Sequence, residues 1–461
     1  MNFISSKDIP LQSYHLEDIL YIDVKPKRMD TDNLLDSDYK LNDKRVENAW
    51  AMFDWANSAY ALVITTAVFP IYFTVVTDEQ FTFLGMQFKN DELLSFTISF
   101  AYLIIALTLP LLSGIADYGG KRMTYMKFFT WMGALGCISL FWFTGMTNLV
   151  FGLLGFMSAV IGFAGGQIFY NSFLPLIVTP EHYDRVSAKG FSMGYFGSVI
   201  LLVIILAMIT FHTSLGFENE LGAMKIGFIM VGLWWIGFAQ IPFRRLPRHE
   251  GKSSEQSLVY KGFQELVKVF KEIRTQKYTK LFLASFFCYI AAVQTVIAMA
   301  SVFAKKELNF ETGELIQLLL LLQLIGALGA YLFSKLSKIK GNKFSLMTII
   351  LIWTLVIIAS YFTYSKGQYY GIAMVVGLVM GGVQSMSRST YSKLIPATEE
   401  NSSSYFSFFD VVEKFSISLG LFTFGYVSGL TNMRTAILSL IAFLVVSVIL
   451  LAMVKVQKPA H

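Results

Sequence analysis

The chain has little of what most soluble enzymes and secreted proteins depend on. Charged residues make up only 15% of its 461 residues, and there are two cysteines, Cys137 and Cys288. Both cysteines lie inside apolar stretches, so we expect buried thiols and no disulfide framework. The sequence contains no metal-ligand spacing, no Walker phosphate loop and no dinucleotide fingerprint. We therefore expect no metal site, no cofactor, no catalytic residues and no ATP-driven pump.

Apolar sequence is abundant instead. Hydrophobic residues make up 55% of the chain, and they gather in stretches that reach the roughly 20 apolar residues a helix needs to cross a bilayer. The twelve stretches are residues 48–75, 92–114, 124–146, 148–175, 188–211, 221–242, 279–303, 314–334, 344–364, 370–395, 404–429 and 433–455. Barrel strands would be shorter and would alternate apolar and polar residues. We therefore predict an all-α membrane protein with twelve transmembrane helices.

The net charge of +6 follows from where the basic residues lie, and it does not indicate nucleic-acid binding. With a cytoplasmic N-terminus, one side of the membrane holds 31 of the 37 lysines and arginines. The other side holds six: Lys89, Lys225, Lys305, Lys306, Lys366 and Arg434. Lysine and arginine collect on the cytoplasmic side of membrane proteins. We expect both termini there, and an inner-membrane location if the protein is bacterial.

Polar segments divide the chain into parts. We predict a cytoplasmic tail at 1–46, a six-helix half at 47–242, a cytoplasmic link at 243–278, a second six-helix half at 279–456 and a short tail at 457–461. The first tail has no signal-peptide run and mixed charges, so we expect disorder. In the link, apolar residues from Val259 to Ile273 recur at helical spacing. This pattern is typical of an amphipathic helix on an anionic membrane surface.

The two halves carry matching features. Gly166 in the fourth stretch is followed fourteen residues later by Pro180, and Gly382 in the tenth stretch is followed fourteen residues later by Pro396. The second and eighth stretches each run into a short loop with glycine and lysine. A parallel repeat of six spans is common in secondary transporters, so we predict that the halves are repeats.

The loop at 114–122 reads Gly-Ile-Ala-Asp-Tyr-Gly-Gly-Lys-Arg. It resembles the loop signature of the major facilitator superfamily, in which glycine, aspartate and basic residues recur at this spacing. The resemblance implies that Asp117 and Arg122 lock an inward gate against neighbouring helices. The alternative is a solvated turn that only follows the charge rule.

A second set of motifs is more specific. These motifs are residues 54–60, 69–73, 293–295, 388–391 and 409–414. Together they resemble the vacuole-effluxer-like branch of that superfamily, which includes fungal vacuolar amino-acid exporters linked to autophagy and many bacterial permeases. The resemblance covers roughly residues 46–455. It departs at 290–292, which are Ile-Ala-Ala where some relatives carry Asn or Asp, so an acidic role there is absent.

An ionisable residue inside a membrane span is costly and is a functional candidate by default. Asp54 lies one to two turns inside the first span, and Asn57 is one turn further on the same face. Asp54 could accept a proton or bind the amino group of a substrate. The alternative is a structural hydrogen bond between helices.

A second charged group consists of Arg388, Asp410, Glu413 and Lys414. The tenth span runs toward the cytoplasm and the eleventh returns, so Arg388 and Asp410 are expected at similar depth. We predict that Arg388 pairs with Asp410 or Glu413, either in a gate that exchanges partners or in a static ion pair.

Neutral polar residues lie in the spans that line the central cavity in this superfamily. They are Gln167, Asn171, Gln294 and Gln384, and Tyr60 is a further candidate for lining the cavity. Such groups suit a small polar solute, although each alone could equally join two helices. Residues 190–194 match the G-x-S-x-G elbow of hydrolases, but they begin a membrane span, so we interpret Gly190, Gly194 and Gly197 as a packing face.

These features predict a secondary transporter that works by alternating access. The resemblance implies amino acids or similar small polar metabolites as substrates, with protons as a candidate coupling ion. Membrane lipids and a small-molecule substrate are the expected partners of a monomer. Two rivals remain: a permease for peptidoglycan fragments or lysolipids, and a non-transporting membrane sensor with a carrier fold.

Overall fold

A computed structural model describes residues 40–248, 258–396 and 401–456. The tail at 457–461 and most of the tail at 1–46 lie outside these residues. The first helix begins at Lys44, because Asp43 caps it by accepting a hydrogen bond from the backbone N–H of Arg45 at 2.7 Å.

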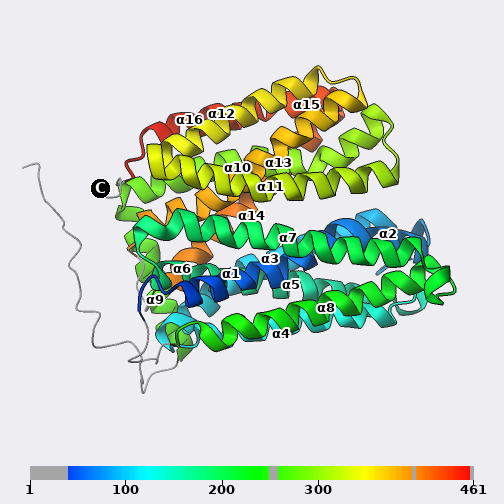
Figure 1. Ribbon diagram of the computed structural model, residues 1–461, viewed down its shortest axis with the longest axis horizontal. Helices are drawn as coiled ribbons and strands as arrows, with labels where there is room; N and C mark the ends of the chain where they lie inside the picture. Colours follow the sequence, from blue (N-terminus) through cyan, green and yellow to red (C-terminus); the bar gives the residue numbers. More distant parts are fainter. Residues whose placement is uncertain (1–39, 249–257, 397–400, 457–461) are drawn as a thin grey trace, which may run out of the picture. The chain divides into compact units, whose positions relative to one another are not determined.

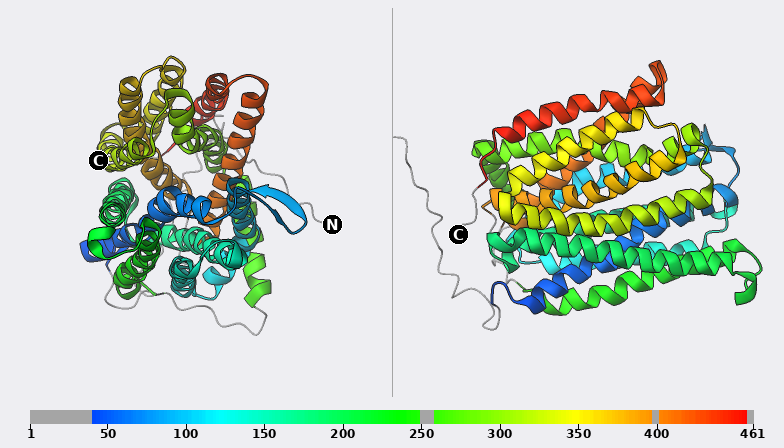
Figure 2. Two further views of the ribbon diagram at one scale, coloured as in Figure 1. Left: turned by 90° about the vertical axis from the view of Figure 1, so that its right-hand side faces the viewer. Right: turned by 45° about the horizontal axis from the view of Figure 1, so that its top comes forward.

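The first half consists of helices joined by short turns and one hairpin. The first span is α1 (Lys44–Ala59), the π-helix η2 (Tyr60–Val68) and α2 (Phe69–Val76). A hairpin follows, β1 (Gln80–Phe83) and β2 (Met86–Lys89), and it projects away from the helices (Figure 2). The remaining elements are α3 (Asn90–Tyr118), α4 (Arg122–Ser139), η3 (Leu140–Trp142), η4 (Met146–Asn148), α5 (Leu149–Ser172), α6 (Leu174–Ile177), η5 (Pro180–His182), α7 (Tyr183–Thr210), η6 (Thr213–Leu215) and α8 (Glu220–Arg245).

The second half begins after a helix in the link. That helix is α9 (Leu258–Thr275). It is followed by α10 (Lys277–Leu308), α11 (Thr312–Lys340), α12 (Asn342–Tyr361), α13 (Lys366–Leu394), α14 (Ser402–Leu430), α15 (Met433–Ser439) and α16 (Ile441–Ala452). Figure 1 shows the long helices running side by side, with the start of α1 and the end of α16 at the same end. We call this the predicted cytoplasmic end.

The predicted fold class is confirmed. Ten helices of the described residues are long and apolar enough to cross a membrane. The third and eleventh predicted spans are also helical, as α4 and α14. Ion-pairing residues on α14, among them Lys414, make that helix less apolar than its neighbours.

Helix α9 packs against the membrane helices on one face and is exposed on the other. A Cβ added at Gly114 of α3 would lie 2.3 Å from the carbonyl oxygen of Gly262, so the two backbones touch where both residues are glycine. Phe270 of α9 packs near Phe408 of α14, with ring centroids 5.8 Å apart. Because α3 belongs to the first half and α14 to the second, α9 contacts both halves.

The charge distribution leads to a labelling prediction. In a variant with Cys137→Ser and Cys288→Ser, a cysteine at Lys89 should react with an impermeant maleimide on intact cells. A cysteine at Lys271 on α9 should react only after the cells are opened. The reverse pattern would show that the bundle has the opposite orientation in the membrane to the one predicted.

Candidate functional site

A buried ion pair joins the two halves. Arg388 lies on α13 and Asp54 on α1, and they are only 3% and 2% exposed. The Nη1 atom of Arg388 is 3.2 Å from Oδ2 of Asp54, and its Nη2 atom is 3.3 Å from the same oxygen. Because α1 and α13 come from opposite halves, this contact cannot persist if the halves separate here.

Both charges of this pair have further hydrogen-bond partners. The hydroxyl of Tyr170 on α5 donates to Asp54 at 2.7 Å, and Gln167 provides a further side-chain hydrogen bond to the same carboxylate. Arg388 donates to Oδ1 of Asn171 at 3.1 Å and to the hydroxyl and carbonyl oxygens of Ser187 at 2.9 and 2.8 Å. A buried ion pair is tolerated only with such additional partners.

Aromatic rings form the walls around the guanidinium group. Its central carbon lies 4.1 Å from the ring centroid of Phe191, 4.6 Å from that of Trp50 and 5.5 Å from that of Tyr170. Such cation–π contacts stabilise a desolvated cation, and they hold the plane of the guanidinium in place. The site therefore presents one cation and one carboxylate within an aromatic enclosure.

The glycines of α7 make room for this site. An added Cβ at Gly190 would lie 2.4 Å from Oδ2 of Asp54 and 2.9 Å from Nη2 of Arg388. Gly194 and Gly197 face Ser58 and the backbone of α1 at similarly short distances. The interpretation of the elbow-like motif as a packing face is confirmed.

Replacing Gly190 with alanine should disturb the ion pair. The new methyl group cannot fit without moving the two charged side chains, and overpacking of this kind costs about 1–3 kcal/mol. We expect transport to fall about tenfold or more, measured as substrate exchange in proteoliposomes. Gly237→Ala on α8, where an added Cβ meets nothing within 4 Å, is the matched control. Equal activity of the two variants would contradict this assignment.

The predicted pairing of Arg388 with Asp410 or Glu413 is wrong. Both acids pair instead with Lys414, each at 3.4 Å. A similar depth in the membrane does not determine the direction in which each side chain points. Arg388 faces α1, α5 and α7, whereas Lys414 lies over the ring of Tyr102 on α3, 5.2 Å from its centroid.

The other predicted polar residues have different surroundings. Asn57 is buried, and its Nδ2 group has no hydrogen-bond partner among the described residues. Gln384 joins the halves by accepting a hydrogen bond from the hydroxyl of Tyr195 on α7 at 2.5 Å. Gln294 is half-buried on α10. Tyr60 was a candidate for lining the cavity, but it stacks on Trp235 of α8 at 5.5 Å in the interior of the first half.

The predicted gate residues Asp117 and Arg122 form a latch between the halves. Arg122 Nη2 is 2.9 Å from Asp117 Oδ1, and Arg122 Nε donates to the hydroxyl of Ser403 at 2.8 Å. The Asp117 carboxylate accepts hydrogen bonds from the backbone N–H groups of Ser403 and Ser404 at 3.2 and 2.7 Å. These are the first free N–H groups of α14, where a negative charge is favoured. We call this contact the first latch.

A second latch was missed in the sequence. Asp184, at the start of α7, accepts hydrogen bonds from Ser337 and Asn342, both at 2.6 Å. Lys393 of α13 lies 2.8 Å from Asp184 and donates to Asn342 at 2.7 Å. A signal was present, because Asn342 lies in the segment predicted to match residues 119–122 of the other half. The acid of this latch, Asp184, lies on α7 in the first half and not in the loop itself. An acidic loop motif therefore does not reveal it.

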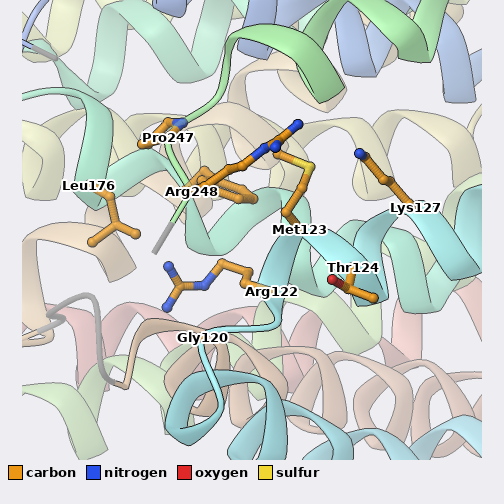
Figure 3. Close-up of a pocket in the computed structure, with 9 residues that line it drawn as sticks. Gly120, Arg122, Met123, Thr124, Lys127, Leu176, Pro247 and Arg248 are labelled. Carbon is orange, nitrogen blue, oxygen red and sulfur yellow. The ribbon is translucent and has the colours of Figure 1, made fainter. Parts of the chain in front are cut away.

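A cavity of about 250 Å³ lies beside the first latch. Figure 3 shows it lined by Arg122, Lys127 and Arg248, with Met123 and Leu176 among the apolar residues. All of these residues belong to the first half or to the segment directly after α8. A site for alternating access has to lie between the halves, so this cavity is not the candidate substrate site.

Comparisons with known proteins agree with this architecture. A family model described as vacuole effluxer Atg22 like matches residues 42–461. An uncharacterized MFS-type transporter of Bacillus subtilis, YxiO, is 30% identical over 411 residues, which cover 88% of this chain and 94% of that protein. Autophagy-related protein 22 of Saccharomyces cerevisiae is 25% identical, covering 74% of this chain and 75% of the yeast protein.

Solved structures show the same fold. The major facilitator superfamily transporter FucP in its outward conformation aligns with a TM-score of 0.66 at 15% identity, covering 90% of this chain and 98% of FucP. The human organic anion transporter MFSD10 aligns with a TM-score of 0.68 at 11% identity, covering 89% of this chain and all (100%) of that one. At such low identities, these likenesses establish the fold alone.

Proposed function

Because the chain belongs to the vacuole effluxer Atg22-like family, a branch of the major facilitator superfamily, we propose that it is a secondary active transporter of amino acids. The transporter class follows from the family and from the fold. The substrate is our proposal, and one observation carries it. That observation is the isolated pair of Arg388 and Asp54 between the two halves.

The pair matches the chemistry of a free amino acid. An α-amino acid carries a carboxylate and an ammonium group on the same carbon atom. The carboxylate would bind the guanidinium fork of Arg388, which suits it in charge and shape. The ammonium group would bind Asp54. The unpaired NH2 group of Asn57, one turn away on the same helix, is a donor and would be available to the substrate carboxylate. Each charge of the protein would thus exchange one partner for another without being left alone.

This exchange would also serve alternating access. In this structure the halves are joined on the side of the predicted cytoplasmic end. The contacts are the pair of Arg388 and Asp54 and the two latches. Opening toward the cytoplasm breaks the pair and would expose two uncompensated charges, which is costly. A bound amino acid would supply the missing partners and lower that cost. A ligand shifts a conformational equilibrium through this kind of differential binding.

Transport assays in proteoliposomes test the proposal. The purified protein should exchange labelled amino acids across the membrane, with and without a pH gradient. A dipeptide, a peptidoglycan fragment and a lysolipid represent the rival substrates. Transport of one of these rivals without any amino acid would overturn the substrate proposal. Failure to transport any solute would favour the non-transporting sensor.

Neutralising Asp54 separates substrate binding from structural support at this site. The Asp54→Asn variant should lose affinity for the ammonium group and retain weak binding of simple carboxylates such as propionate. The expected loss is about 100-fold in amino-acid affinity, in the range for removing one charged partner. Binding can be followed by quenching of tryptophan fluorescence, since Trp50 lies 4.6 Å from the Arg388 guanidinium. Unchanged amino-acid affinity would assign Asp54 to structure alone.

A further inference from the structure

A second charged cluster lies inside the bundle, apart from the substrate site. It consists of Asp410, Glu413 and Lys414 on α14 together with Tyr102 on α3. Lys414 is 3.4 Å from each carboxylate and 5.2 Å from the centroid of the Tyr102 ring. The contact between Lys414 and Tyr102 crosses from the second half to the first.

Asp410 differs from Asp54 in how its oxygens are satisfied. Asp410 is 8% exposed, and its Oδ1 atom faces Lys414. Its Oδ2 atom is buried and has no hydrogen-bond partner among the described residues. Asp54, by contrast, accepts hydrogen bonds from Tyr170 and Arg388. A buried oxygen without a partner is unfavourable for a carboxylate and far less so for a neutral acid.

The charges of the cluster do not balance. Two carboxylates and one ammonium group leave one negative charge in a region of low dielectric. One added proton makes the cluster neutral. Asp410 is the more buried acid, with a side chain 11% exposed against 26% for Glu413, so desolvation favours its protonation. Among the described residues, the other titratable side chains that face the cluster are Tyr102 on α3 and Tyr289 on α10. A tyrosine is ordinarily uncharged at pH 7.

We propose that Asp410 is the proton-binding site that couples transport to a pH gradient. This inference rests on the proposed transport function. A proton from one side of the membrane binds the carboxylate of Asp410 and gives a neutral carboxylic acid. Lys414 is then held by Glu413 alone, and its contact with Tyr102 across the halves changes. After the halves rearrange, the same proton leaves to the other side, so one proton crosses in each cycle.

The Asp410→Asn variant tests this role in proteoliposomes. It should lose uptake driven by a pH gradient by about tenfold or more, while exchange of substrate at equal pH stays within about twofold of wild type. A pH-sensitive dye inside the vesicles should report substrate-dependent proton entry with the wild-type protein and none with the variant. Asp78→Asn, an exposed acid in the loop after α2, is the control and should behave as wild type.

Glu413→Gln gives an opposite expectation. Removing this neighbouring negative charge lowers the proton affinity of Asp410, so gradient-driven uptake should persist with its pH profile shifted to lower pH. If Glu413→Gln abolishes proton entry and Asp410→Asn preserves it, the site is Glu413 and the inference is wrong. Amino-acid transport by the wild-type protein without any proton entry would also overturn it, while leaving the proposed function intact.

A measurement on the wild-type protein covers the case in which Asp410→Asn does not fold. Dicyclohexylcarbodiimide reacts with protonated carboxyl groups inside membranes. Mass spectrometry should find it on Asp410, with more labelling at about pH 6 than at about pH 8. Asp54 should stay unlabelled, because Arg388 and Tyr170 already hold its carboxylate. Labelling of Asp54 and not of Asp410 would contradict the assignment and needs no transport substrate.

Discussion

Arg388→Gln is expected to abolish amino-acid transport and to destabilise the folded protein. The change removes the cation and leaves Asp54 buried with a negative charge and only neutral partners. Breaking a buried ion pair from one side costs roughly 3–5 kcal/mol. Removing the carboxylate-binding group should at the same time reduce exchange of amino acids by at least about 100-fold. Exchange in proteoliposomes and thermal unfolding in detergent measure the two effects separately.

Two further variants separate function from structural support. Arg388→Lys keeps the charge but loses the fork, so it should keep most of the stability and lose most of the transport. The double variant Arg388→Gln with Asp54→Asn leaves neither charge alone and should recover part of the stability. Transport should not recover with it. If the double variant transports normally, the pair only holds the helices together, and the proposed substrate contacts are wrong.

Much of the architecture could be predicted because the bilayer constrains it strongly. A membrane helix must be long and apolar, so each of the twelve predicted stretches is visible by composition alone. The hairpin after α2 was not predicted, because β1 and β2 are only four residues each and lie outside the apolar stretches. Short strands such as these depend on a turn, here through Leu84 and Gly85 with positive φ angles of 50° and 81°.

The site could be predicted only in part. Asp54, Gln167, Asn171 and Arg388 were all identified as polar residues inside apolar spans, and the structure brings them together. The sequence could not say that Arg388 pairs with Asp54, since they are 334 residues apart and depth leaves the rotation of each helix open. Aromatic residues such as Phe191 gave no signal among 42 phenylalanines.

Removing both latches should shift the transporter toward a state that is open to the predicted cytoplasmic end. Asp117→Asn weakens charge-assisted hydrogen bonds to the first turn of α14, and Asp184→Asn removes the charged partner of Lys393. Hydrogen bonds to charged groups contribute about 1.5–3 kcal/mol each. A loss of about 2 kcal/mol at one latch changes the ratio of two conformations roughly 30-fold. The double variant should therefore change the equilibrium more than either single change.

A cysteine at Ser172 reports this opening. The Ser172 hydroxyl is buried and accepts a hydrogen bond from Ser403 at 3.2 Å across the two halves. In a variant without native cysteines, it should react slowly with a maleimide applied from the predicted cytoplasmic side, and at least about 30-fold faster when both latches are removed. Asp78→Asn, at the opposite end, should leave the rate unchanged. Equal rates with and without the latches would mean that other contacts keep this end closed. If Asp117→Asn speeds the labelling and Asp184→Asn does not, the closure depends on the first latch. Only that latch contacts the start of α14 beside Ser172.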